Sequence, residues 1–224
     1  KKAKEGKLTV EPGSNQLIWN MRYPDAETFE GMILWWSSLS GPTALPGKYD
    51  VVLSINGQSQ TQEFEIVKDP RSSATQTDLK AQFDFQNEVI AKLSETNLAI
   101  KDIRKARIQI EDVIKKTEAD TIKNFGKSIL EEMKEIEEAL YQTKNRSGQD
   151  PLNYPIRLNN KLGHLNSLMG MGDNRPTESA IEFKKEVTAR INKQLDALNL
   201  ILDEKVEDFN ELVKAKEVKA VKLD

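Results

Sequence analysis

The sequence predicts an α+β protein in which a partial immunoglobulin-like β-sandwich precedes an antiparallel bundle of three helical arms, the middle one broken. Up to about residue 67, apolar and polar residues alternate between turn signals, as in strands of a half-buried sheet. From residue 76 onward, apolar residues recur at spacings of three and four, the period of an amphipathic helix. A linker of small and turn-forming residues, 68–75, separates these regions. We therefore expect a β module at 1–70 and a helical bundle at 76–217.

The predicted β module contains four strand candidates. The first two, 8–10 and 16–23, flank a turn rich in Gly and Pro. Apolar residues alternate along 49–55, and a partner strand at 59–67 follows the dipeptide Asn56-Gly57. Both central residues of a type I′ turn need positive φ, which makes Asn-Gly a strong hairpin signal. Four strands do not close a sandwich, so we expect that the sheet is incomplete or that its first strands precede this chain.

The predicted bundle begins with one long helix. Its apolar seam covers 79–114, and a helix of this kind is about 60 Å long at 1.5 Å per residue. We place a turn at 117–121, since a helix running straight on would be too long for a chain of this size. A second seam covers 122–140, a short third helix follows Pro155, and the last helix runs over about 177–216.

The lengths of these helices favour three antiparallel arms. The first and last helices are each about 40 residues long, and the second and third together nearly match them. The middle arm is then broken at 145–155, where Gly148, Pro151 and Pro155 prevent a continuous helix. A four-helix up-down bundle is the alternative, in which two long helices face two short ones.

Composition argues against several functional classes. Lys and Arg number 33 and Asp and Glu 36, a net charge of -3 with mixed signs, so nucleic acid is not an expected partner. With no cysteine, the chain has no disulfide, no thiolate metal ligand and no cysteine nucleophile. No apolar run approaches the roughly 18 residues of a membrane span. We expect no bound cofactor.

Three stretches carry a resemblance to a known family. They are 19–26 with 32–36 (WNMRYPDA and MILWW), 68–75 (KDPRSSAT) and 140–161 (LYQTKNRSGQDPLNYPIRLNNK). Together they resemble the C-terminal region of large secreted bacterial proteins built on sortilin-like propellers of BNR, sialidase-type repeats. The resemblance implies a secreted, periplasmic or cell-surface location in bacteria, and it implies upstream propeller domains of the same protein as partners. Proteins of this family are often described as glycosyl hydrolases because of their propeller repeats.

The sequence shows no catalytic constellation of its own. A glycosidase needs two carboxyl groups about 5 Å or about 6.5–9.5 Å apart across a cleft. The acidic residues here instead follow the polar faces of helices. The single histidine, His164, has no cysteine and no nearby acidic ligand, so we expect a surface or helix contact, not a metal site. We therefore expect no glycoside hydrolysis by this chain.

Paired tryptophans mark the first candidate contact site. Trp35 and Trp36 lie in 28–39, a largely apolar stretch that interrupts the predicted β module. Such a pair can stack on sugar rings, or it can pack the stretch onto the bundle, where each ring buries about 150–250 Å². We expect packing, with both indoles mostly buried, because the stretch would otherwise expose a large apolar patch.

The break in the helical region is the second candidate contact site. Its side chains either satisfy backbone groups that the break frees or recognise a partner. We expect the polar side chains to be ordered and hydrogen-bonded, and the tyrosine rings to cover the break. The candidate residues are Tyr141, Asn145, Arg146, Asp150, Asn153 and Tyr154.

These observations favour a non-catalytic structural or interaction module in the C-terminal region of a secreted propeller protein. It would pack against the propellers or contact a protein or glycan partner. The alternative is a carbohydrate-binding accessory domain of a glycosyl hydrolase, with Trp35 and Trp36 as the sugar-stacking residues. Binding to a glycan array distinguishes the two.

Overall fold

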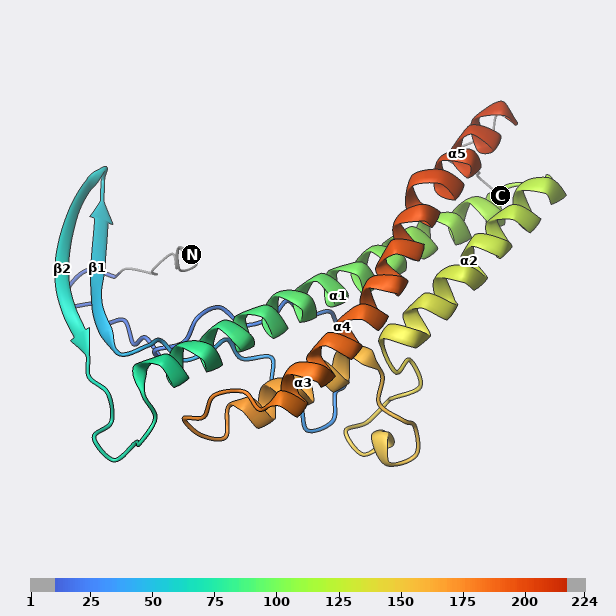
Figure 1. Ribbon diagram of the computed structural model, residues 1–224. Helices are drawn as coiled ribbons and strands as arrows, with labels where there is room; N and C mark the ends of the chain where they lie inside the picture. The colour runs from blue at the N-terminus through green and yellow to red at the C-terminus, as the bar shows by residue number, and fades with distance from the viewer. Residues whose placement is uncertain (1–10, 217–224) are drawn as a thin grey trace.

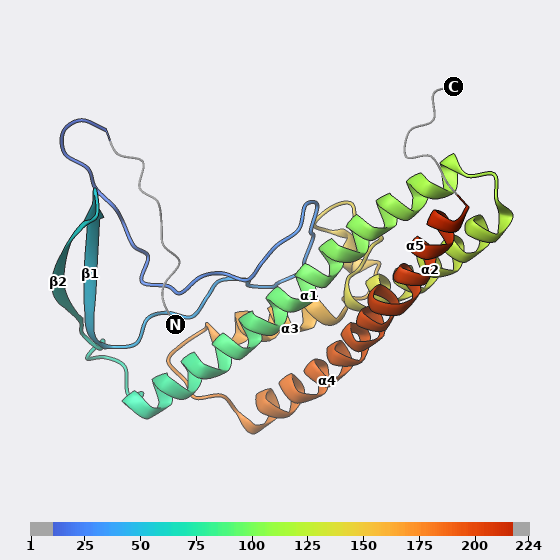
Figure 2. The ribbon, with the colours of Figure 1, turned by 90° about the horizontal axis from the view of Figure 1, so that it is seen from above.

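The computed structural model describes residues 11–216, which form a β hairpin followed by a long helical region (Figure 1). The hairpin stands at one end of the molecule, and the helices extend away from it (Figure 2). Within the described residues, every helix is too short or too polar to cross a lipid bilayer. In chain order the elements are β1 (Gly47–Ile55), β2 (Gln58–Ile66), α1 (Gln76–Lys116), α2 (Asp120–Leu140), the 3₁₀ helix η1 (Asp150–Leu152), α3 (Leu158–Met169), α4 (Glu178–Leu200), the π-helical turn η2 (Ile201–Lys205) and α5 (Val206–Ala215).

The predicted hairpin is confirmed. β1 and β2 pair antiparallel, with Ile55 opposite Gln58 next to the turn. Asn56 and Gly57 connect them with φ of 50° and 80°, the positive values that a type I′ turn requires. Four apolar residues of β1 share one face of this two-stranded sheet, and Val52 lies on the opposite face. The four are Tyr49, Val51, Leu53 and Ile55.

The strand predicted at 16–23 is wrong. Most of this segment has no regular secondary structure, and Arg22 alone forms a bridge, with Thr43. Asn20 Oδ1 accepts the Arg22 amide at 3.0 Å and Met21 has φ of 57°, so the chain turns here instead of continuing as a strand. The candidate at 8–10 lies outside the described residues. Among residues 11–216 the sheet has two strands, and the immunoglobulin-like sandwich stays a prediction.

Local sequence signals set the ends of α1. At its start, Thr75 Oγ1 accepts the Asp78 amide at 3.1 Å, and the Asp78 carboxylate accepts the Thr75 amide at 3.1 Å. This reciprocal capping box satisfies two amides that have no partner within the helix. α1 ends at Lys116 and α2 begins at Asp120, which confirms the turn predicted at 117–121.

The predicted interruption of the helical region is also present. Between Leu140 and Leu158 the chain leaves the α-helical path, and the short η1 is its one regular element there. α2 lies beside one half of α1 and α3 beside the other half (Figures 1 and 2). α4 continues through η2 into α5 and contacts α1, α2 and α3. The core fills the space between these helices, and the predicted inward positions of α3 are buried in it: Leu158, Leu162, Leu165 and Met169.

Candidate functional site

Before the chain enters β1, residues 21–44 fold into an antiparallel loop that lies along α1 and α3 (Figure 2). Backbone hydrogen bonds join its two arms, among them Tyr23 N–H to Pro42 O at 2.9 Å. Gly41 allows the arms to come this close, because a Cβ at that position would lie 2.1 Å from Tyr23 O. The tip of the loop, residues 27–38, rests on the helices and is called the docked loop below.

Three buried asparagines on α1 and α3 hold the docked loop and its return arm; we call them the amide row (Asn97, Asn160 and Asn166). Asn97 Nδ2 donates to Glu27 O at 2.7 Å. Asn160 Oδ1 accepts the Trp35 amide at 2.7 Å, and Asn160 Nδ2 donates to Trp35 O at 2.8 Å. Asn166 Nδ2 donates to Ser38 O at the end of the docked loop and to Ser40 O in the return arm, each at 3.0 Å. An asparagine side chain offers a donor and an acceptor, so it can pair with a backbone as a neighbouring strand would.

The next turn of α3 brings the helix backbone itself against the docked loop. The Ser38 amide donates to Gly163 O at 3.0 Å. A Cβ on Gly163 would lie 2.8 Å from the Ser37 Cβ, so a larger residue would push the loop away. His164 Nδ1 lies 3.0 Å from Trp36 O, so this histidine contacts the docked loop and not another helix through that atom.

The burial predicted for both indoles is wrong for Trp36. Its side chain is 70% exposed and its φ is 48°, a left-handed conformation that bulky residues rarely adopt. Trp35 is half-buried, and the two ring centroids lie 6.3 Å apart with 33° between the planes. Trp36 is exposed because Asn160 and His164 fix the peptide groups on both sides of it, while Phe29 fills the core beneath the loop.

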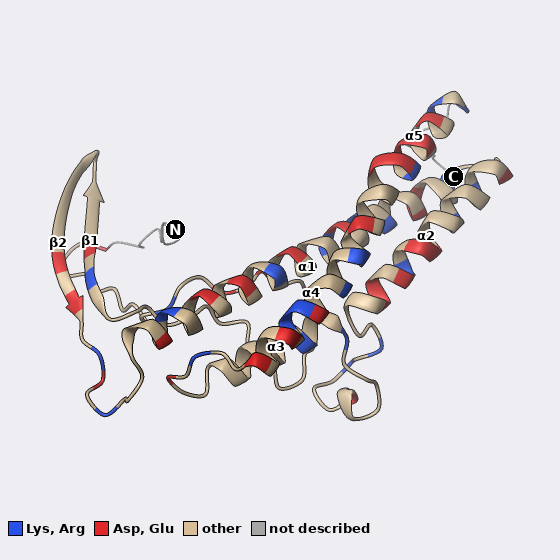
Figure 3. Cartoon of the chain, in the orientation of Figure 1, with Lys and Arg blue, Asp and Glu red and all other residues tan. Residues whose placement is uncertain are grey.

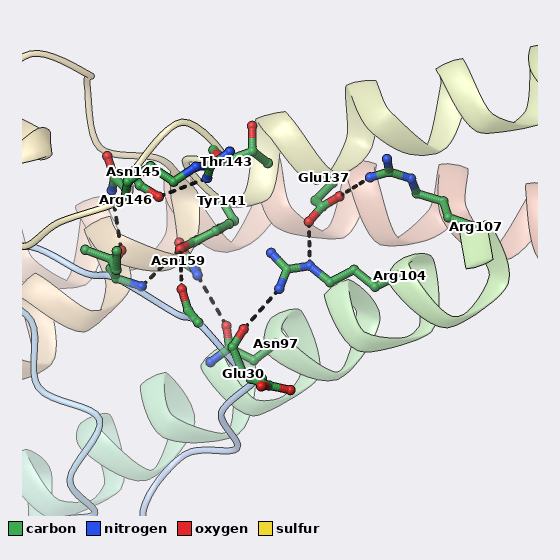
Figure 4. Close-up of polar contacts among 12 residues, drawn as sticks. Glu30, Asn97, Arg104, Arg107, Glu137, Tyr141, Thr143, Asn145, Arg146 and Asn159 are labelled. Carbon is green, nitrogen blue, oxygen red and sulfur yellow. Dashed lines mark hydrogen bonds and ion pairs between the residues drawn. The ribbon is translucent and has the colours of Figure 1, made fainter. Parts of the chain in front are cut away.

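Tyr141 connects the helix break to the docked loop. It is 3% exposed, and its hydroxyl accepts the Ile33 amide at 3.0 Å and donates to Gly31 O at 3.3 Å. Its ring meets Phe29 edge to face at 4.9 Å, an arrangement that the ring quadrupoles favour. The ring thus packs on the docked loop, and its hydroxyl satisfies two backbone groups of that loop (Figure 4). The Tyr154 ring, which was also expected to cover the break, is exposed.

Arg146 and Asp150 of the break are hydrogen-bonded, as expected, whereas Asn145 Oδ1 is buried without a hydrogen-bond partner among the described residues. Asn145 is 5% exposed, and Arg146 Nη1 donates to Thr143 O at 2.9 Å. The Asp150 carboxylate accepts the Arg146 and Ser147 amides as well as the Ser147 hydroxyl. These donors, with the nearby Arg146 charge, hold the pKa of the Asp150 carboxyl below its usual value.

A buried carboxylate stands next to this network. Glu137 on α2, 3% exposed at its side chain, accepts from Arg104 Nε at 2.7 Å and Arg107 Nη1 at 2.9 Å. Arg104 also donates to Glu30 O at 3.2 Å and stacks over the Phe29 ring at 4.6 Å from its centroid. The arginine therefore joins α1, α2 and the docked loop, with its charge compensated by Glu137 (Figure 4).

The structure brings some of the predicted site residues together and separates others. Tyr141 and Asn145 both hydrogen-bond the Ile33 backbone, two residues before Trp35, so the break contacts the loop that carries the tryptophan pair. Asn153 and Tyr154 are exposed on the far part of the break, where Lys144 Nζ lies 5.8 Å from the Tyr154 ring centroid. Their side chains do not take part in holding the docked loop.

Sequence reasoning missed the amide row as a group. Asn97 occupies a position of the α1 apolar seam, and a polar residue at such a position is a signal that a buried partner exists. Asn160 and Asn166 gave a weaker signal, because α3 is short and its polar residues fit an ordinary amphipathic pattern. All three asparagines bind backbone groups of a distant segment. Because these groups do not depend on residue type, the sequence of that segment does not reveal the contact.

Among residues 11–216, no cluster of three or more His, Asp or Glu side chains is placed to hold a metal ion. Glu137 is the one carboxylate that is buried in this range, and both of its oxygens are engaged by arginines. The chain matches no model of a known protein family, no curated protein and no solved structure.

Proposed function

We propose that this chain is a non-catalytic structural and interaction module, and that its hairpin is a contact surface for neighbouring β structure. The observation that carries this proposal is the uncovered apolar face of β1. Val51 is 55% exposed, Leu53 47% and Ile55 60%, although alternation places them together on one face. A contiguous apolar face of this kind usually marks an interaction site.

The hairpin also lacks the support that a small sheet needs. Two strands by themselves are marginal in water, and three or more with a packed face are required for independent stability. Trp19 gives partial cover, with its ring centroid 6.1 Å from that of Tyr49 and 6.2 Å from that of Phe64. Among the described residues, no aromatic ring covers the half of the hairpin nearer the turn, so an additional β element is its natural complement.

We extend the proposal to the architecture. α1, α2 with α3, and α4 with α5 are then the three arms of an antiparallel bundle whose middle arm is broken, and the hairpin belongs to an immunoglobulin-like sandwich. The contacts of α2 and of α3 with both α1 and α4 support this reading of the helices. The resemblance described above supports a C-terminal position in a secreted propeller protein, with the propellers as the neighbouring structure. Engagement of Glu137 by two arginines supports the absence of catalysis.

The experiment uses two faces of the same strand. The double variant Val51→Thr with Leu53→Thr makes the apolar face polar, and Val52→Thr does the same on the opposite face, where Val52 is 58% exposed. Binding of each purified protein to the separately produced propeller region is measured by calorimetry. The double variant should weaken binding by about tenfold or more, and the control should not. Absence of wild-type binding, or equal losses in both variants, would contradict the proposal.

A second candidate function is carbohydrate binding, and Trp36 favours it. An indole that is 70% exposed and held by a clamped backbone presents a rigid apolar face, which suits stacking on a sugar ring. A glycan array probed with wild type, Trp36→Ala and Phe183→Ala tests this, because Phe183 is an exposed aromatic residue on α4 far from the loop in sequence. Glycan signals that Trp36→Ala abolishes and Phe183→Ala retains would establish the candidate. If the wild-type protein binds no glycan on the array, carbohydrate binding is ruled out as the second function.

A further inference from the structure

A hollow of about 480 Å³ opens where the segment leading into α3 meets the middle of α4. Four cationic side chains line it: Arg157 and Lys161 from the start of α3, and Arg190 and Lys193 from α4. The two pairs are about thirty residues apart in sequence, so only the packing of α3 on α4 gathers them. Figure 3 shows the blue Lys and Arg segments of α4 where this helix passes α3. We call this site the basic hollow.

The charge of the basic hollow is unbalanced. None of its nine lining residues is acidic, although the whole chain carries more acidic than basic residues. Arg190 pairs with Glu186 at 3.3 Å, but both side chains are more than half exposed, so the pair is weak. In the part of the chain that the structure describes, no carboxylate forms an ion pair with Arg157, Lys161 or Lys193. Like charges held together without a counter-charge repel each other, and an external anion would relieve that repulsion.

The end of α3 at the basic hollow adds to this imbalance. Arg157 is the N-cap residue of α3, and its side chain forms no capping hydrogen bond. The first turn of α3 contains no acidic residue, in contrast to α1, where Thr75 and Asp78 cap the helix. The N-terminus of a helix carries a partial positive charge, which disfavours cations there and favours an anion. The four cationic side chains of the hollow and this helix end therefore both favour the binding of an anion.

We propose that the basic hollow binds a tetrahedral oxyanion, a sulfate or phosphate group, either free or carried as an ester on a sugar. Two arginines supply planar donor pairs and two lysines supply point charges, the combination that suits an oxyanion with more than one negative charge. Gln194 lines the same hollow and offers an uncharged amide donor. This site involves neither the β hairpin nor Trp36, so the test of anion binding is independent of the tests of the functions proposed above.

The test follows backbone amide signals of the purified chain by nuclear magnetic resonance while sodium phosphate or sodium sulfate is added at constant ionic strength. Sodium chloride serves as the reference. We expect saturable shifts of amides in the first turn of α3 and in the adjacent part of α4, absent with chloride. A sulfated tetrasaccharide and its desulfated counterpart form the second arm. Tighter binding of the sulfated sugar assigns the group to a glycan ester, whereas equal affinities for it and for free sulfate assign the site to the isolated oxyanion.

Variants locate the binding. The double variant Arg157→Gln with Lys193→Gln should weaken phosphate binding by about tenfold or more, because it removes two charge-assisted contacts. Lys185→Gln is the matched control, an exposed lysine on α4 that does not line the hollow. Circular dichroism verifies that each variant is folded. Shifts that do not saturate, shifts scattered over the surface, or equal losses in the double variant and the control would each overturn the proposal. If the double variant does not fold, the proposal is judged by whether the saturable shifts of the wild-type protein are confined to the first turn of α3 and the adjacent part of α4.

Discussion

Replacing Asn160 by alanine should loosen the docked loop without disturbing the hydrophobic core. The Asn160 side chain is buried and makes three hydrogen bonds to the loop: it accepts from the Trp35 amide at 2.7 Å and donates to Trp35 O and Ser37 Oγ, each at 2.8 Å. Each such bond contributes about 1 kcal/mol net to folding, and a buried group left without a partner costs more. We therefore expect Asn160→Ala to lower the free energy of unfolding by about 3 kcal/mol.

The assay is urea unfolding followed by far-ultraviolet circular dichroism. For a chain of this size, a loss of about 3 kcal/mol corresponds to a decrease in the melting temperature of about 6–12 °C. Asn153→Ala is the control, since this asparagine is exposed and its side chain makes no hydrogen bond within the described residues. Hydrogen exchange adds a local readout, because the Trp35 amide should lose its protection in Asn160→Ala. If the two variants agree within about 0.5 kcal/mol, the amide row does not hold the loop.

Three further perturbations test other contacts. Gly163→Ala should destabilise the fold by about 1–3 kcal/mol in urea unfolding, since its Cβ would lie 2.8 Å from Ser37 Cβ. Gly148→Ala is the control and should have almost no effect, because no atom lies within 4 Å of a Cβ at that position. Glu137→Gln should cost about 1–3 kcal/mol in urea unfolding, because two partly exposed arginines lose their shared counter-charge; an unchanged midpoint would contradict this. The pKa of Asp150 is lowered in the fold, so its stabilisation is full at neutral pH and is lost as the pH falls below about 4. The Ser147 amide signal should report this acid transition, and Asp150→Asn should lack it.

Local patterns predicted most of the helical and turn positions. Asn56-Gly57 specified the hairpin because positive φ at both positions is a backbone requirement that few other pairs meet. The turn at 117–121 and the break before α3 followed from helix length and from proline chemistry, which act within a few residues. The strand expected at 16–23 failed because the alternation there competes with a local turn at Asn20, and no second strand pairs with it among the described residues.

The candidate site was predicted only in part. Arg146 was expected to satisfy the freed backbone of the break, and its Nη1 does so at Thr143 O. Tyr141 and Asn145 instead hydrogen-bond the Ile33 backbone of the docked loop. Trp36 was expected to be buried because apolar residues surround it in sequence, yet its exposure depends on contacts from His164, more than a hundred residues away. A sequence pattern reports which side chains are apolar, but not which of them a distant helix turns outward.

The sequence by itself determined where helices, turns and the hairpin lie, because hydrophobic period, proline and glycine act on their immediate neighbours. Tertiary structure alone decided three features: the docked loop, the exposure of Trp36 and the basic hollow. Each arises where α3 meets a segment far away in the chain, through hydrogen bonds to backbone or through charges brought together by helix packing. Every residue except proline offers the same backbone N–H and C=O groups, and charges act through space, so neither kind of contact leaves a periodic pattern in the sequence.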